Sequence, residues 1–348
     1  RQVKGFAYTL AIGIIVSMFT ALVITRLLLK LFYDFGAKNE QLYGVIKDTK
    51  TFNFIGKKNI FFCISAALIL VGIVTVSVNG ARGRGMFNYG LDFKGGTSTT
   101  VTFNQDYSQS EIESTIIPDI VSAIGDSTVQ QQKVQGGNDV VFKTNNLTIE
   151  QREALEKLFT SKYGVEQSSI LTENISGAVS NEMKTDAVVA VIIATICMLL
   201  YIWFRFKDIR FAGSAVLALL HDVLVVVGFY AVARITLGNT FIACMLTIVG
   251  YSINATIVIF DRIRENLGQM GKADLAEIVN ASISQTMRRS VYTTLTTFIM
   301  VVILFILGVS AIREFAAPLM VGIICGGYSS VCITGALWYV LKLSLIHI

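Results

Sequence analysis

The chain has 348 residues, of which 53% are apolar and 15% are charged, and its mean hydropathy is +0.62. A soluble protein of this size could not bury so much apolar surface, so the composition excludes an ordinary water-soluble enzyme and predicts a membrane protein. The net charge of +5 does not indicate nucleic-acid binding, because the basic residues concentrate in short connections between apolar runs, as membrane topology requires.

Seven apolar runs are each close to the ~20 residues that a helix needs to cross the hydrocarbon core. They are residues 6–25, 59–78, 187–204, 211–233, 240–260, 290–309 and 316–341. Lys and Arg cluster in the connections 26–58, 205–210 and 261–289, which places these connections in the cytoplasm and residues 80–184 outside it. The predicted fold class is therefore a polytopic α-helical membrane protein with about seven spans and one extracytoplasmic domain.

The extracytoplasmic segment is predicted to be an α+β domain of the ferredoxin-like class. Its expected elements are a strand at 97–103, a helix at 113–125, a hairpin around the turn 136–139, a helix at 148–163 and a strand at 166–172. Pro118 is the weak point of the first helix, whereas Thr148 and Gln151 have the spacing of a capping box at the start of the second. The order β-α-β-β-α-β is typical of the split βαβ pattern.

No catalytic, cofactor or metal site is predicted. The five cysteines all fall within the apolar runs without paired metal-ligand spacing, so they are interpreted as small packing residues. Gly95 and Gly96 are interpreted as a tight turn rather than a phosphate-binding loop, because no helix with a lysine follows them. There is also no arrangement of nucleophile and base.

Polar residues inside the spans are the candidate functional site. His221 and Asp222 are the only Asp, Glu, Lys, Arg or His residues within the seven runs. Such residues usually pair with one another or face a polar pathway. Ser252, Asn254 and Thr256 lie within about one turn on the next span, and Arg288 and Arg289 stand at the inner end of the span after that. These residues predict either a polar, ion-conducting network or hydrogen-bonded contacts that only hold helices together.

Several stretches resemble a known family. VKGFAYTLAIGIIVSMFTALVITRLLL (3–29) resembles the last membrane helix of SecD, and YGLDFKGGT (89–97), GYSINATIVIFDRIREN (250–266) and SQTMRRS (284–290) resemble SecF. The chain thus resembles the C-terminal part of a fused SecDF protein, within the resistance-nodulation-division superfamily. The positions that match the family motifs are Leu91, Asp92, Phe93, Gly95, Gly96, Asp261, Arg262 and Arg264.

The resemblance implies a bacterial plasma-membrane protein that assists late stages of preprotein translocation, with possible energy from an ion gradient. Its implied partners are the remaining SecD half, the SecYEG channel, SecA, the emerging preprotein and membrane lipid. The chain begins with Arg1 and ends without a polar tail, so both ends are expected to be cut. The expected parts are a SecD-like helix (1–31), a cytoplasmic linker (32–58), a first SecF-like helix (59–79), the extracytoplasmic domain (80–184) and a five-helix bundle (185–348).

One departure from the family pattern bears on mechanism. The family has an Asp after Asn254, regarded as central to proton transfer, and this chain has Ala255 there. The family's membrane Arg corresponds to Arg289, which is present. Asp222 could therefore act in a relay through Asn254 and Thr256 toward Arg289, or it could only hold helices together. The alternative functions are a transporter of lipids or small solutes from the same superfamily and a non-coupled structural partner of the translocon.

Overall fold

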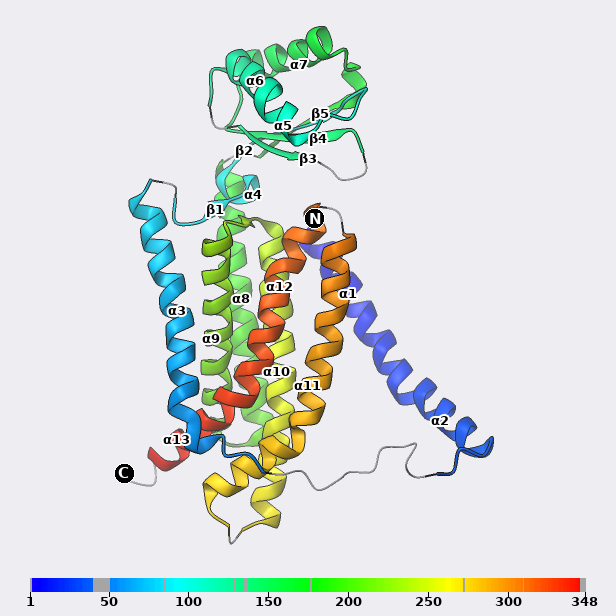
Figure 1. The fold of residues 1–348 in the computed structure, drawn as a ribbon, viewed down its shortest axis with the longest axis vertical. Helices are drawn as coiled ribbons and strands as arrows, with labels where there is room; N and C mark the ends of the chain where they lie inside the picture. Colours follow the sequence, from blue (N-terminus) through cyan, green and yellow to red (C-terminus); the bar gives the residue numbers. More distant parts are fainter. Residues whose placement is uncertain are drawn as a thin grey trace.

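Long helices form a bundle below a small α+β unit (Figure 1). The structure is a computed structural model that describes residues 2–39, 51–83, 85–127, 129–133, 137–175, 177–271, 273–308 and 310–344. The predicted linker at 32–58 and the predicted turn at 136–139 therefore lie partly outside the described residues. The first helix begins on the side of the α+β unit, and the last one ends on the opposite side of the bundle.

Within the described residues, seven helices are long and apolar enough to cross a membrane, so the predicted fold class is confirmed. Their elements are α1 (Gln2–Phe19), η1 (Thr20–Ile24) and α2 (Thr25–Asp34) in one span, then α3 (Lys58–Ala81), α8 (Gly177–Phe206), α9 (Ile209–Ala233), α10 (Asn239–Gln269), α11 (Leu275–Leu307), and finally α12 (Ser310–Tyr328), η6 (Ser329–Thr334) and α13 (Gly335–Ser344). Several helices extend beyond the apolar runs because polar residues continue the same hydrogen-bonded turns outside the hydrocarbon core.

The centre of the bundle consists of α9, α10 and α12. Half or more of the residues in their apolar windows are buried, against 11% for α3 and none for the α1–α2 span. Close backbone contact holds α3 to α9, since a Cβ atom added to Gly72 would lie 2.9 Å from the Cα of Gly228. Small residues at such crossings allow membrane helices to pack in the absence of a hydrophobic driving force between them.

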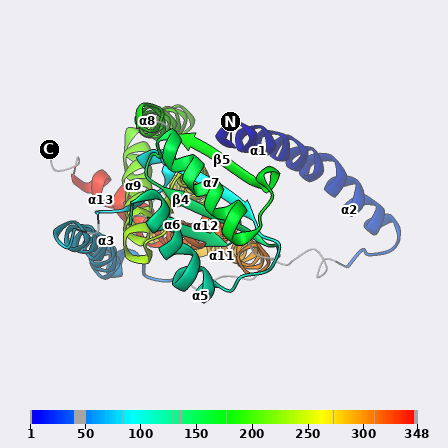
Figure 2. The ribbon, with the colours of Figure 1, turned by 90° about the horizontal axis from the view of Figure 1, so that it is seen from above.

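The small unit, residues 96–175, is called here the sheet domain. Its antiparallel sheet has the order β3-β4-β2-β5. The strands are β2 (Gly96–Thr102), β3 (Gln130–Lys133), β4 (Asp139–Thr144) and β5 (Ile170–Ile175), and the helices are α5 (Gln109–Glu111), η4 (Ile112–Ile116), α6 (Ile117–Ile124) and α7 (Ile149–Tyr163). Helices α6 and α7 lie over one face of the sheet (Figure 2). A core that includes Val101, Phe142 and Phe159 separates the helices from the strands. This is the predicted ferredoxin-like arrangement.

Two details of the sheet domain test the local predictions. The capping box is present. The backbone N–H of Gln151 donates to Thr148 Oγ1 at 3.3 Å, and the backbone N–H of Thr148 donates to Gln151 Oε1 at 2.9 Å. Pro118 does not break its helix: it is the second residue of α6 and follows the π-helical turn η4, and the chain stays helical from Gln109 to Ile124.

The predicted boundaries of the last strand are wrong. The strand occupies 170–175 rather than 166–172, because residues 167–169 form the 3₁₀ turn η5 (Gln167–Ser169). The Ser169 amide donates to the carbonyl of Glu166 at 2.8 Å, so this stretch hydrogen-bonds within itself and is not part of the sheet. A local turn therefore overrides the extended pattern that the side chains indicate.

A short connection joins the sheet domain to the bundle. Strand β1 (Asn88–Tyr89) pairs in parallel with β6 (Thr236–Leu237), and the helical turn α4 (Leu91–Lys94) follows it and contacts α8. The sequence reasoning did not predict α4. Gly90 permits the close approach of β1 and β6, since a Cβ atom there would lie 2.9 Å from Thr236 Cγ2. Gly95 and Gly96 have φ values of 76° and 146°, which supports their interpretation as a tight turn.

Candidate functional site

The centre of the site is the carboxylate of Asp222, which is fully buried in the middle of α9. Within the described residues, four side chains surround it. His221 Nδ1 lies 2.9 Å and Cys325 Sγ 3.2 Å from Oδ1, while Ser252 Oγ and Ser329 Oγ donate to Oδ2 at 2.6 and 2.7 Å. These five residues are called the Asp222 cluster. They join α9, α10 and the α12–η6 helix.

The local sequence explains how α12 supplies two of these partners. Cys325 and Ser329 are four residues apart, so they lie on the same face of the helix. The π-helical turn η6 begins at Ser329, and the backbone carbonyl of Ser329 accepts a hydrogen bond from Thr334 Oγ1 at 3.0 Å. Gly326 allows α12 to approach α10, since a Cβ atom there would lie 3.3 Å from the Cβ of Ser252. Single π-turns inside helices often occur at functional sites.

The hydrogen bonds compensate for the burial of a charge. A carboxylate at the centre of the bilayer costs about 2.5–3.5 kcal/mol on insertion scales. Each hydrogen bond to a charged group contributes about 1.5–3 kcal/mol, so four donors exceed this cost. No Lys or Arg forms an ion pair with Asp222 among the described residues, and its contact with the His221 imidazole is a hydrogen bond at 2.9 Å. The cluster therefore stabilises the packing of three helices through hydrogen bonds rather than through a basic partner.

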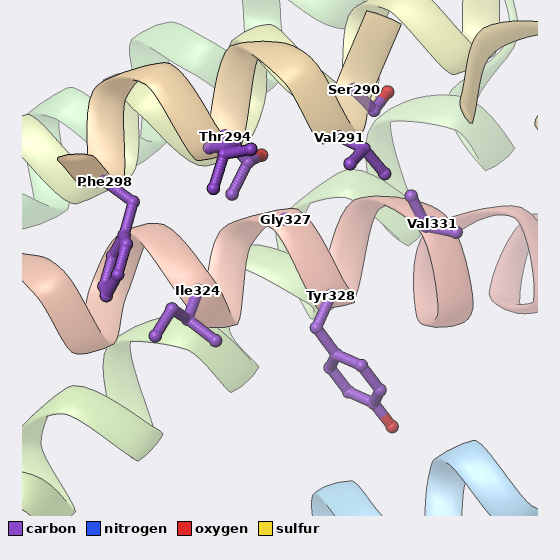
Figure 3. Close-up of a pocket in the computed structure, with 9 residues that line it drawn as sticks. Ser290, Val291, Thr294, Phe298, Ile324, Gly327, Tyr328 and Val331 are labelled. Atoms are coloured by element: carbon purple, nitrogen blue, oxygen red, sulfur yellow. The ribbon is translucent and has the colours of Figure 1, made fainter. Parts of the chain in front are cut away.

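His221 and Tyr328 extend the site toward α3. Their ring centroids are 6.3 Å apart, and the Tyr328 hydroxyl donates to the carbonyl of Phe61 at 2.8 Å. Nε2 of His221 is buried and has no hydrogen-bond partner within the described residues. Figure 3 shows Tyr328 pointing away from α11. A cavity of about 270 Å³ lies between α11 and α12, and its lining includes Tyr328, Phe298 and Ile324. This cavity is mostly apolar and is separate from the Asp222 cluster.

The structure brings together only part of the predicted polar network: Ser252 of α10 reaches Asp222, but Asn254 and Arg289 do not. Ser252 and Thr256 are buried, but Asn254 is exposed on the surface of the bundle. Residues two positions apart on a helix point about 200° apart, so Asn254 cannot share the face of its two neighbours. Arg289 is also exposed and makes no hydrogen bond or ion pair with Asp222. No direct hydrogen bond joins Asp222 to Asn254 or Arg289 within the described residues, and the relay stays a prediction.

Three threonines of α11 form hydrogen bonds within their own helix. Thr293, Thr296 and Thr297 donate to carbonyl groups one turn earlier in their own helix, at distances of 2.8–2.9 Å. The hydroxyl protons of these threonines are thus used within α11. Gly250 does not mark a close helix crossing, since no atom of another element lies within 4 Å of a Cβ atom built there.

The family motif at the end of α10 opposite the sheet domain forms a separate polar group. Asp261 pairs with Arg205 of α8 at 3.1 Å and with Arg264 at 3.1 Å. Arg262 donates to Gln285 of α11 and pairs with Glu265, both at 2.6 Å. These contacts connect α10 with its two neighbours.

The other family motif lies where the sheet domain meets the bundle. Phe93 is 3% exposed and packs in a bundle core with Tyr230 and Leu237. Leu91 and Asp92 belong to α4, and Gly95 and Gly96 form the turn described above. The motif therefore attaches the sheet domain to the bundle and does not contribute to the Asp222 cluster.

Sequence reasoning missed Cys325 and Ser329. The interpretation of all cysteines as packing residues is wrong for Cys325, whose sulfur contacts a carboxylate. The available signal was the spacing of four between Cys325 and Ser329 in an apolar run, the same spacing that correctly places Ser252 and Thr256 on one face.

Comparison with known proteins assigns the chain to a family. The family described as protein export membrane protein SecD/SecF, C-terminal, matches residues 154–344, and the SecD/SecF GG motif matches residues 87–106. With the seven apolar helices, these matches define a multi-pass plasma-membrane protein of the protein-export class. The chain belongs to the SecD/SecF family.

Relatives and solved structures agree with this assignment. Protein translocase subunit SecDF of Thermus thermophilus is 36% identical over 339 residues, covering 96% of this chain and 44% of that protein. Protein translocase subunit SecF of Petrotoga mobilis is 37% identical, covering 81% of this chain and 93% of that protein. The crystal structure of the Thermus SecDF, described as a translocon-associated membrane protein, has a TM-score of 0.80 at 34% identity. It covers 99% of this chain, which spans less than half the length of these SecDF relatives.

Proposed function

We propose that this chain is the SecF-side part of an accessory subunit of the Sec translocon, which assists late stages of preprotein translocation across the bacterial plasma membrane. The observation that carries the proposal is the match over 99% of the chain to a translocon-associated membrane protein, at 34% identity. The proposed partners are the remaining SecD half, the SecYEG channel, SecA and the emerging preprotein. The sheet domain would then contact polypeptide on the exit side.

The exposed polar residues of the bundle support contact with further helices. Asn254 and Arg289 are exposed on membrane-spanning helices whose neighbouring surface is largely apolar. Polar and charged side chains facing lipid are costly, and they usually face other protein or water. In the proposed complex these two residues contact the SecD half.

The geometry favours a structural role for the Asp222 cluster over ion coupling. Four donors satisfy the carboxylate, and no chain of hydrogen bonds leads from it to Arg289 within the described residues. Ala255 provides no carboxylate at the position where the family has its acid. In this proposal the chain therefore supports translocation without proton transfer by a carboxylate next to Asn254.

The test is complementation. Cells depleted of their own SecD and SecF would receive the complete gene that encodes this chain, and processing of a secreted protein would be followed by pulse-chase labelling. We expect restored processing, and loss of it when residues 97–175 are replaced by an inert linker while the membrane level of the protein is unchanged. Unrestored processing at a normal membrane level would reject the translocation function. Restored processing with the linker variant would reject the role of the sheet domain alone.

A further inference from the structure

Three side chains of the Asp222 cluster are of types that bind metal ions. His221, Asp222 and Cys325 are all buried, and their donor atoms lie within 4.8 Å of one another. The separations are 2.9 Å between His221 Nδ1 and Asp222 Oδ1, 3.2 Å between Oδ1 and Cys325 Sγ, and 3.9 Å between Sγ and Nδ1. Imidazole, carboxylate and thiolate are all ligands of zinc.

The triangle has nearly the size that a tetrahedral ion requires. Bond lengths of about 2.0–2.3 Å at tetrahedral angles place neighbouring ligand atoms about 3.4–3.6 Å apart. Each observed separation is within about 0.5 Å of that range, so rotations of the side chains are sufficient to admit an ion. Ser252 and Ser329 already bond the other carboxylate oxygen. Carboxylates that bind a metal ion are usually held in this way by hydrogen bonds from outer groups, here the two serines.

We propose that His221 Nδ1, Asp222 Oδ1 and Cys325 Sγ form a binding site for a divalent transition-metal ion of the zinc class. On binding, the Cys325 thiol proton leaves to solvent, and the imidazole proton moves from Nδ1 to Nε2, which has no partner among the described residues. One carboxylate and one thiolate then balance the two positive charges of the ion. A neutral group replaces a buried anion that pairs with no Lys or Arg in the described chain.

On one side of the site, Cys325 borders a cavity. With Leu68, Val225 and Tyr328 it lines a cavity of about 340 Å³ between α3, α9 and α12. The three protein ligands leave a fourth tetrahedral position open, which is the arrangement of zinc sites that bind an additional small ligand.

The probe is Co²⁺, because cobalt bound to a thiolate in tetrahedral geometry has both a charge-transfer band and strong visible bands. The chain would be purified in detergent, with the exposed Cys63 and Cys197 replaced by Ser so that no exposed thiol of these two competes for cobalt. We expect one Co²⁺ per chain with a thiolate band, displaced by an equal amount of Zn²⁺. Cys325→Ser should abolish the band, whereas the matched control Cys244→Ser, at another buried cysteine, should retain it.

A second variant tests the outer layer without removing a ligand. Ser329→Ala should weaken cobalt affinity by about 10–100-fold, the usual effect of losing a group that orients a metal ligand. Absence of a thiolate band in the parent chain would overturn the proposal. A band that persists at full strength in Cys325→Ser would also overturn it, because the ion would then be adventitious.

Discussion

Replacing Asp222 by Leu removes the acceptor that four donors share. Hydrogen bonds to a charged group contribute about 1.5–3 kcal/mol each, so the four lost bonds correspond to about 6–12 kcal/mol. Removing a carboxylate from the middle of the membrane recovers about 2.5–3.5 kcal/mol. The Ser329 hydroxyl also lies 3.3 Å from the carbonyl of Gly326, so part of its bonding is regained. We therefore expect the lower bound, a destabilisation of about 3 kcal/mol.

The assay is the unfolding free energy of the purified chain in mixed micelles, measured after chelator treatment so that no bound ion contributes. Asp222→Asn keeps the size of the side chain and one acceptor oxygen, so it should cost about half as much. Ser214→Ala is the matched control, since Ser214 is buried on the same helix and bonds to carbonyls of its own turn. If Asp222→Leu falls within the error of Ser214→Ala, the hydrogen-bonded cluster does not stabilise the bundle and the reasoning is refuted.

Three further outcomes are expected. A cysteine placed at Ser168 should react with an impermeant thiol reagent from outside the cell, and labelling only from the cytoplasm would invert the predicted topology. The sheet domain should lose stability below about pH 4. Hydrogen bonds from Lys162 and Tyr163 lower the pKa of Asp119 in the folded domain. The stability that this carboxylate contributes is lost as the pH falls through its folded-state pKa. Thermal melts of the isolated domain should show less of this loss in Asp119→Asn; equal loss would contradict the assignment. Gly72→Leu should separate α3 from Gly228 and lower thermal stability, whereas Gly13→Leu, in open space, should not.

Local chemistry explains which predictions succeeded. A membrane span depends on the mean apolarity of about 20 consecutive residues, and the capping box of α7 depends on two side chains three positions apart. Strand order in the sheet domain follows from the order of its short strands and helices, since few topologies connect them without crossing. The late start of β5 was missed because turn formation at 167–169 competes with an extended pattern of similar strength.

The sequence by itself determined the membrane class, the seven spans, the ferredoxin-like order and the presence of a histidine and an aspartate in mid-membrane. Only the tertiary structure decided what these two residues meet. Whether Asn254 or Ser252 faces Asp222 depends on the rotation of α10 about its axis, and Cys325 and Ser329 reach the site because α12 packs closely against α10 at Gly326. Helix rotation and crossing arise from packing among residues far apart in the chain. An apolar run is similarly apolar on every face, so its sequence does not show which face packs against which neighbour.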